Sequence, residues 1–150
     1  MNMSQPLRVL LVEDDVADVA LVTDAFASQD LASDLHHVAD GVEALAFLRR
    51  EDPYPDAPRP DLILLDLNMP RVDGRQVLAE IKADDSLKAI PVVVFTTSAA
   101  ADDVVTSYGA HANAYVTKPI DLDDFERALA EIRGFWGRTV TLPHDPPTGT

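Results

Sequence analysis

The sequence contains no cysteine and has few basic residues. Without cysteine, the protein has no disulfide framework, no thiolate zinc site and no cysteine nucleophile. Lysine and arginine together number 12 against 26 acidic residues, which gives a formal net charge of −14. A surface of that sign repels nucleic acid and anionic lipid, because binding to either normally requires a basic face. We therefore expect neither of them as a partner.

Long apolar runs are also missing. The longest runs have the length of a strand, and the opening residues, MNMSQPLR, lack the apolar core of a signal peptide. A chain of 150 residues that is 47% hydrophobic has room for one core. We therefore expect a soluble, cytoplasmic protein. Residues 1–136 are assigned to its domain and residues 137–150 to a proline-rich C-terminal extension.

Short aliphatic runs alternate with segments of helical periodicity. The runs predicted as strands are Leu7–Val12, Leu35–Val38, Leu62–Leu65, Val92–Phe95 and Ala114–Val116. Strands with nearly continuous aliphatic residues, each followed by a helix, predict a parallel sheet covered on both faces. Right-handed crossovers then favour the α/β class, with a flavodoxin-like (βα)5 doubly wound sheet in the strand order 2-1-3-4-5.

Charged and hydroxyl side chains follow four of these strands, at the edge where such folds bind ligands. Glu13 and Asp14 follow the first strand, Asp66 the third, Thr96 ends the fourth, and Lys118 follows the fifth. Carboxylates a few ångströms apart repel by on the order of 4 kcal/mol per close pair. A divalent cation would hold them together, and Mg²⁺ suits a site with one or two carboxylates.

Aspartates at two other positions have a structural interpretation. Asp15 is expected to cap the helix that begins near Val16, and Asp73-Gly74 to form the turn that starts the next helix but one. His36 and His37 are expected to be surface or packing residues of an edge strand, away from the acidic cluster.

Four motifs occur in a fixed order along the chain. They are LLVEDD at 10–15, LLDLNMPRVDG at 64–74, PVVVFTTS at 91–98 and AYVTKP at 114–119. As a set, they resemble the receiver domain of two-component response regulators, over about residues 7–133. The proline-rich segment at 51–60 and the FW…VTLP stretch at 135–143 are similar to stand-alone regulators that are paired with phytochromes.

The resemblance implies that a sensor histidine kinase, of the phytochrome type, transfers a phosphoryl group to Asp66. Asp14 and Asp66 would bind Mg²⁺ directly, Glu13 would act mostly through water, and the backbone carbonyl of Asn68 would be a further ligand. The protein would signal by protein–protein contact. It would not be an enzyme beyond its own phosphoryl transfer and slow autodephosphorylation.

The resemblance also assigns roles around the phosphoacceptor. Lys118 would pair with Asp66 and then with the phosphoryl group, and a cis Lys118–Pro119 bond would aim its ammonium inward. Thr96 would donate its hydroxyl to a phosphoryl oxygen, and Tyr115 would be the switch aromatic coupled to it. Asn68 and Ser98 would tune the lifetime of the phosphoryl group.

Large apolar residues near the C-terminus, together with the resemblance to regulators paired with phytochromes, predict a homodimer. Its interface would comprise the helix after Ser98, the strand at Ala114–Val116, the last helix and the tail. The interface residues are expected to be Phe135, Trp136, Val140 and Leu142, because large aromatic residues often anchor interfaces.

Three alternatives remain open at this point. The protein could be a phosphate sink with no downstream output. A haloacid-dehalogenase-type phosphatase also uses an Asp nucleophile, but it needs a second acid where Asn68 stands. A flavodoxin-type FMN protein would need a phosphate-binding loop after the first strand, where this chain places three acids.

Overall fold

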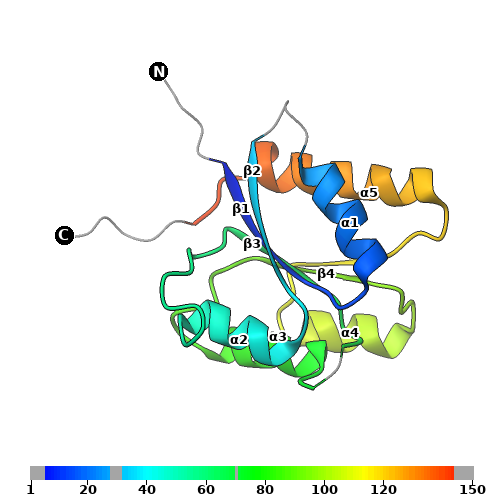
Figure 1. Cartoon of the computed structure of the whole chain (residues 1–150). Coiled ribbons are helices and arrows are strands. Elements are labelled where there is room, and N and C mark those ends of the chain that lie inside the picture. The colour runs from blue at the N-terminus through cyan, green and yellow to red at the C-terminus, as the bar shows by residue number, and fades with distance from the viewer. Residues whose placement is uncertain (1–5, 28–31, 70, 144–150) are drawn as a thin grey trace.

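The structure, a computed structural model, describes residues 6–27, 32–69 and 71–143. Within these ranges, five parallel strands form one sheet in the order β2-β1-β3-β4-β5, so the predicted fold is confirmed (Figure 1). The strands are β1 (Leu7–Val12), β2 (Ser33–Val38), β3 (Leu62–Leu65), β4 (Val92–Thr96) and β5 (Ala114–Thr117). The helices are α1 (Val16–Phe26), α2 (Gly41–Arg49), α3 (Gly74–Ala83), α4 (Ala101–Gly109) and α5 (Leu122–Gly134), followed by the π-helix η1 (Phe135–Thr139).

Helices cover both faces of the sheet, with α1 and α5 on one side and α2, α3 and α4 on the other (Figure 1). Successive strand residues point to opposite faces, so each strand contributes to two hydrophobic clusters. In β1, Leu10 and Val12 belong to the cluster beneath α2 and α3, whereas Val9 and Leu11 belong to the cluster beneath α1 and α5. Every residue of β3 and β4 is buried, which explains why these strands have no polar alternation.

Aspartate side chains cap four of the five α-helices in the described ranges. Asp15, Asp40, Asp73 and Asp121 each accept a hydrogen bond from a backbone N–H in the first turn. Such caps satisfy N–H groups that have no partner within the helix. The predicted capping roles of Asp15 and Asp73 are confirmed. Helix α4 has no side-chain cap and buries only Ser107, in keeping with its weak sequence pattern.

The C-terminal segment continues the last helix further than its sequence pattern predicts. The backbone stays helical through η1 to Thr139, beyond Trp136, and residues 144–150 of the expected extension lie outside the described residues. Trp136 and Leu142 pack against the cluster beneath α1 and α5. Part of the segment assigned to the extension therefore lies against the domain's own core.

No helix of the described residues has both the length and the apolar character needed to cross a membrane.

The proline-rich segment before β3 is held against α2 instead of projecting from it. The Tyr54 hydroxyl donates to Glu43 at 3.0 Å, and the Arg50 guanidinium donates to the carbonyl of Ala57 at 2.8 Å.

Gly74, at the carboxyl edge of the sheet, and Gly134, at the end of α5, offer a matched test of local packing. A Cβ on Gly74 would lie 2.1 Å from the backbone oxygen of Asp66, whereas a Cβ on Gly134 would meet no atom within 4 Å. We expect Gly74→Ala to lower the free energy of unfolding by about 2 kcal/mol or more, because the backbone must shift. Gly134→Ala should raise it by about 0.5–1 kcal/mol, because Gly134 has helical dihedral angles. Urea denaturation measures both, and equal effects would contradict the close approach.

Candidate functional site

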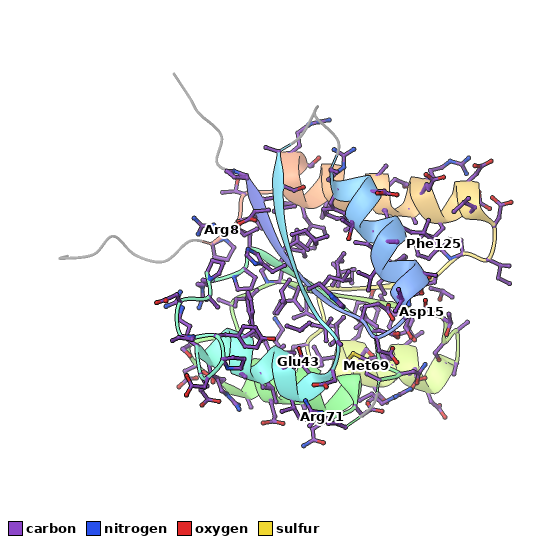
Figure 2. All side chains as sticks on the ribbon, viewed as in Figure 1. Arg8, Asp15, Glu43, Met69, Arg71 and Phe125 are labelled. Atoms are coloured by element: carbon purple, nitrogen blue, oxygen red, sulfur yellow. The ribbon has the colours of Figure 1, made fainter. Side chains whose placement is uncertain are left out.

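Three carboxylates meet at the carboxyl edge of the sheet. Glu13 and Asp14 follow β1, and Asp66 follows β3. The last residues of these two strands are paired, and the Asp66 N–H donates to the carbonyl of Val12 at 3.1 Å. One ligand oxygen from each of the three carboxylates lies within 4.8 Å of the others. Glu13 and Asp66 are buried and Asp14 is exposed, so the cluster opens to solvent on one side. Asp15, the residue after Asp14, caps the start of α1 (Figure 2).

Lys118 is the cation of this cluster. It follows β5, and its Nζ lies 2.5 Å from Glu13 Oε1, 2.8 Å from Asp18 Oδ2 and 3.4 Å from Asp66 Oδ2. Its side chain is only 4% exposed. The predicted pairing with Asp66 is the longest of the three. Asp18 was missed from the sequence because it looks like an ordinary acid in the first turn of α1.

The peptide bond after Lys118 corrects one expectation from the resemblance. The cis peptide bond found among the described residues is at Asp52–Pro53, and the Lys118–Pro119 bond is trans. The ammonium nevertheless points inward, because ion pairs with three carboxylates hold it there.

Burial and charge oppose each other at this edge. Burial raises the pKa of Glu13 to about 7, against the lowering effect of its hydrogen bond with Lys118. Burial disfavours the charge of Lys118, but hydrogen bonds to Asp18 and Glu13 outweigh it and raise the pKa of Lys118 above its usual value. Three carboxylates contact the Lys118 ammonium, and Asp14 adds a further carboxylate to the cluster, which leaves an excess of negative charge.

The Thr96 hydroxyl is buried without a partner. Thr96 ends β4, has no exposed surface, and its Oγ1 makes no hydrogen bond within the described part of the chain. A buried polar group in this state costs about 1–3 kcal/mol. An oxygen-rich ligand at the carboxyl edge would relieve this cost, which fits a phosphoryl group.

The loop after Asp66 is held at both ends. The Asn68 N–H donates to Asp66 Oδ1 at 3.3 Å, while the residue itself is exposed. Further along, the Arg71 guanidinium forms two hydrogen bonds, of 2.9 and 3.0 Å, to the carboxylate of Asp40 at the start of α2. These bonds lower the pKa of Asp40. Arg71 was not singled out from the sequence, where it reads as a surface residue, and Pro70 lies outside the described residues.

Tyr115 and Ser98 are joined directly. Tyr115 is half-buried on β5, and its hydroxyl donates to the backbone carbonyl of Ser98 at 2.8 Å. The Ser98 hydroxyl itself donates to Asp103 on α4 at 2.6 Å. The predicted switch aromatic therefore contacts the loop that follows Thr96.

The two histidines of β2 differ in their surroundings. His36 contacts Asp34 and the ring of Phe47, which fits the predicted packing role. His37, however, hydrogen-bonds the backbone carbonyl of Glu13 at 2.7 Å. The expectation that both lie away from the acidic cluster is wrong for His37, because the pairing of β1 with β2 places its ring beside the end of β1.

The residues expected at a dimer interface gather mostly near the opposite edge of the sheet. A cavity of about 560 Å³ is lined by Trp136, Val140 and Leu142 together with Leu7 and Pro60, which lie at the amino ends of β1 and β3. Phe135 is 48% exposed and packs edge-on against Trp136. These residues are therefore separated from the acidic cluster by the length of the sheet.

The residues at the carboxyl edge fit a divalent cation and a phosphoryl group together. The excess carboxylate charge of Glu13, Asp14 and Asp66 supplies oxygen ligands for the cation. The Thr96 hydroxyl, which has no hydrogen-bond partner among the described residues, and the ammonium of Lys118 are the kind of donors from which phosphoryl oxygens accept.

Comparison with known proteins gives a consistent result. The sequence matches the model of the response regulator receiver domain over residues 9–130. It is 49% identical over 138 residues to the response regulator Rcp1 of Synechocystis sp., covering 92% of this chain and 94% of that protein. It is 41% identical over 132 residues to the probable methanogenesis regulatory protein FilR2 of Methanothrix harundinacea, covering 87% and 84%.

Solved structures give the same picture. The phosphorylated cyanobacterial phytochrome response regulator RcpA superimposes with a TM-score of 0.91 at 48% identity, covering 93% of this chain and 100% of that one. The Mn²⁺-bound form of Rcp1 superimposes with a TM-score of 0.90 at 49% identity, with the same coverage.

The charge balance of the cluster predicts opposite effects for two substitutions. Asp14→Ala removes an exposed carboxylate from an over-acidic cluster, so it should raise the melting temperature of the metal-free protein and reduce the further rise produced by Mg²⁺. Lys118→Met leaves buried carboxylates unpaired and should lower the free energy of unfolding by about 3 kcal/mol. Thermal melts with EDTA or Mg²⁺ measure both. A lower melting temperature for Asp14→Ala in EDTA would contradict the repulsion.

Proposed function

Because the chain belongs to the receiver-domain family of response regulators, we propose that it accepts a phosphoryl group on Asp66 from a sensor histidine kinase. The observation that carries this proposal is the cluster of Asp66 with Glu13, Asp14 and Lys118 at one sheet edge. Membership of this family argues against the alternative that the protein is a haloacid-dehalogenase-type phosphatase. Members of the family are signalling proteins, and their own phosphoryl transfer is not classical enzyme turnover.

In the proposed reaction, a carboxylate oxygen of Asp66 attacks the phosphorus of a kinase phosphohistidine. The new O–P bond forms as the P–N bond breaks, and the electron pair of that bond returns to the imidazole. Lys118, already 3.4 Å from Asp66 Oδ2, can donate to a phosphoryl oxygen, and the free hydroxyl of Thr96 can donate to another. Asn68, exposed beside Asp66, would influence the water that later hydrolyses the aspartyl phosphate, and so the lifetime of the phosphoryl group.

Glu13, Asp14, Asp66 and the backbone carbonyl of Asn68 would hold Mg²⁺. When bound, Mg²⁺ supplies the positive charge that neutralises phosphoryl oxygens near the carboxylates. The related Rcp1 structure is described as Mn²⁺-bound, which supports a divalent cation at this edge. Asp14 is the exposed member of this set, so a cation would reach the carboxylates from its side.

The proposed kinase is of the phytochrome type. The support comes from the relatives, since RcpA is described as a phytochrome response regulator. Histidine kinases draw their phosphoryl group from ATP, so we place the exchange in the cytoplasm. Tyr115 is hydrogen-bonded to the loop after Thr96 and would transmit the conformational change that follows phosphorylation to the α4–β5–α5 face. The output would be contact with another protein.

The phosphoacceptor is tested by transfer from a phosphorylated phytochrome-type histidine kinase. Wild-type protein should be labelled in Mg²⁺, and EDTA should abolish labelling. Asp66→Asn should remain unlabelled because it removes the nucleophile, whereas Asp85→Asn, which changes an exposed surface acid, should be labelled like wild type. Label that persists on the Asp66→Asn protein would overturn the assignment. Equal labelling by an unrelated histidine kinase would contradict the phytochrome partner.

A homodimer across the α4–β5–α5 face is the second part of the proposal. Four exposed apolar side chains support it, namely Val105 and Tyr108 of α4, Ile120 before α5 and Leu122 at its start. Phe135 follows α5 and is also exposed. Trp136 and Leu142 already contact the protein's own core, so in this proposal they support the end of α5 from within.

Sedimentation velocity at tens of micromolar tests the dimer. The double substitution Val105→Glu with Ile120→Glu places two carboxylates in the proposed interface and should convert the dimer to a monomer. Val16→Glu changes an equally exposed apolar residue on α1 and should leave the dimer intact. A wild-type protein that sediments as a monomer would refute the dimer.

A further inference from the structure

A carboxylate on α4 joins the two loops that border the proposed phosphorylation site. Asp103 Oδ1 accepts from Arg75 Nε at 2.9 Å, and Oδ2 accepts from Arg75 Nη2 at 2.9 Å and from the Ser98 hydroxyl at 2.6 Å. Arg75 lies on α3, directly after the loop that begins at Asp66. Ser98 lies two residues beyond Thr96. The pair therefore links the element after β3 to the element after β4.

The guanidinium of Arg75 extends this link back toward the phosphoacceptor. Its Nη1 donates to Asp73 Oδ2 at 3.0 Å and reaches the backbone carbonyl of Leu67 at 3.5 Å. Leu67 is the residue after Asp66, and its carbonyl also accepts from the Gly74 N–H at 3.0 Å. Arg75 thus contacts both ends of the loop that carries Asn68.

Ser98 is held a second time, through its backbone. Its carbonyl accepts from the Tyr115 hydroxyl at 2.8 Å, and the Tyr115 N–H donates to the hydroxyl of Tyr108 on α4 at 3.2 Å. The ring of Tyr115 packs against the hydrophobic cluster beneath α2 and α3. Ser98 is therefore fixed by α4 on its side chain and by β5 on its backbone.

From these contacts we propose that Arg75 and Asp103 are positioning residues that hold the loop after β4 in the arrangement that presents the Thr96 hydroxyl to a phosphoryl group on Asp66. This inference rests on the proposed function of Asp66. Among the described residues the Thr96 hydroxyl is buried and has no hydrogen-bond partner, so no existing hydrogen bond has to break before a phosphoryl oxygen accepts from it. Contacts that restrain the loop directly after Thr96 lower the cost of ordering this donor when the phosphoryl group forms.

The Arg75–Asp103 contact has the geometry of a strong ion pair. Two parallel N–H donors meet the two oxygens of one carboxylate, an arrangement that fixes orientation as well as charge. Hydrogen bonds from Arg75 and Ser98 lower the pKa of Asp103 to about 2, so the pair stays charged at neutral pH. The single contact of Arg127 with Asp124 on α5, between side chains 67% and 55% exposed, lacks these features and makes a matched control.

Binding of beryllofluoride, a mimic of the aspartyl phosphoryl group, tests the inference in the presence of Mg²⁺. We expect Asp103→Asn and Arg75→Gln each to weaken binding by about fivefold or more, within the range typical of coupling between sites. Arg75→Lys keeps the positive charge but loses the two-donor geometry of the guanidinium, so its affinity for beryllofluoride should lie between those of Arg75→Gln and wild type. Asp124→Asn and Arg127→Gln should bind like wild type. Wild-type affinity in the Arg75→Gln and Asp103→Asn proteins would overturn the inference.

Ser98→Ala provides a second variant that removes only one hydroxyl. It should weaken beryllofluoride binding in the same direction, and adding Asp103→Asn should produce less than the sum of the two separate effects, because both remove the same link. Fully additive effects would contradict a shared route through Ser98.

The inference and the proposed function fail in different ways. If wild-type protein does not bind beryllofluoride, the role of Asp66 is wrong. The loop is then examined by NMR without ligand, where Asp103→Asn should shift the Tyr115 ring and Ser98 amide signals and Asp124→Asn should not. Unchanged signals in the Asp103→Asn protein would show that the pair does not position the loop.

Discussion

The balance between one buried ammonium and its surrounding carboxylates is the constraint on which the carboxyl edge depends. Lys118 is held against Glu13, Asp18 and Asp66, and without it these acids would face one another in a poorly solvated site. A parallel sheet makes the conflict unavoidable, because it brings the ends of β1, β3 and β5 to the same edge. The remaining negative charge favours a bound divalent cation at this edge.

The surrounding loops are built to keep that edge in place. Gly74 lets the start of α3 approach the backbone of Asp66, and Gly41 does the same for α2 against Val72, where a Cβ would lie 2.2 Å from the Val72 carbonyl oxygen. Arginines then join separate elements, with Arg71 bound to Asp40 and Arg75 bound to Asp103. Close backbone contacts and forked ion pairs thus fix loops that have little hydrophobic surface of their own.

The two edges of the sheet have different tasks in this picture. The proposed phosphoryl chemistry lies at the carboxyl edge, whereas the end of α5 and the following segment cover part of the amino edge near Leu7 and Pro60. Helix α4 and strand β5 connect the proposed phosphorylation site to the proposed interface. Tyr115 contacts the loop at Ser98, while Val105 and Tyr108 are exposed on the outer surface of α4. A shift at Thr96 therefore has a short physical route to an exposed apolar face.

The sequence by itself determined the strand order, the capping roles of Asp15 and Asp73, and the convergence of Glu13, Asp14 and Asp66. The strand order follows from hydrophobic periodicity and from the handedness of crossovers. The convergence follows from the common edge of parallel strands, and the caps follow from the local hydrogen bonding of aspartate side chains. Only the tertiary structure decided which partners these residues have. Asp18 beside Lys118, His37 beside Glu13, and Asp103 beside Arg75 and Ser98 are far apart in sequence or look like ordinary surface residues. Such contacts depend on how the helices and strands pack against one another, and the residue pattern along the chain does not show which side chains this packing brings together.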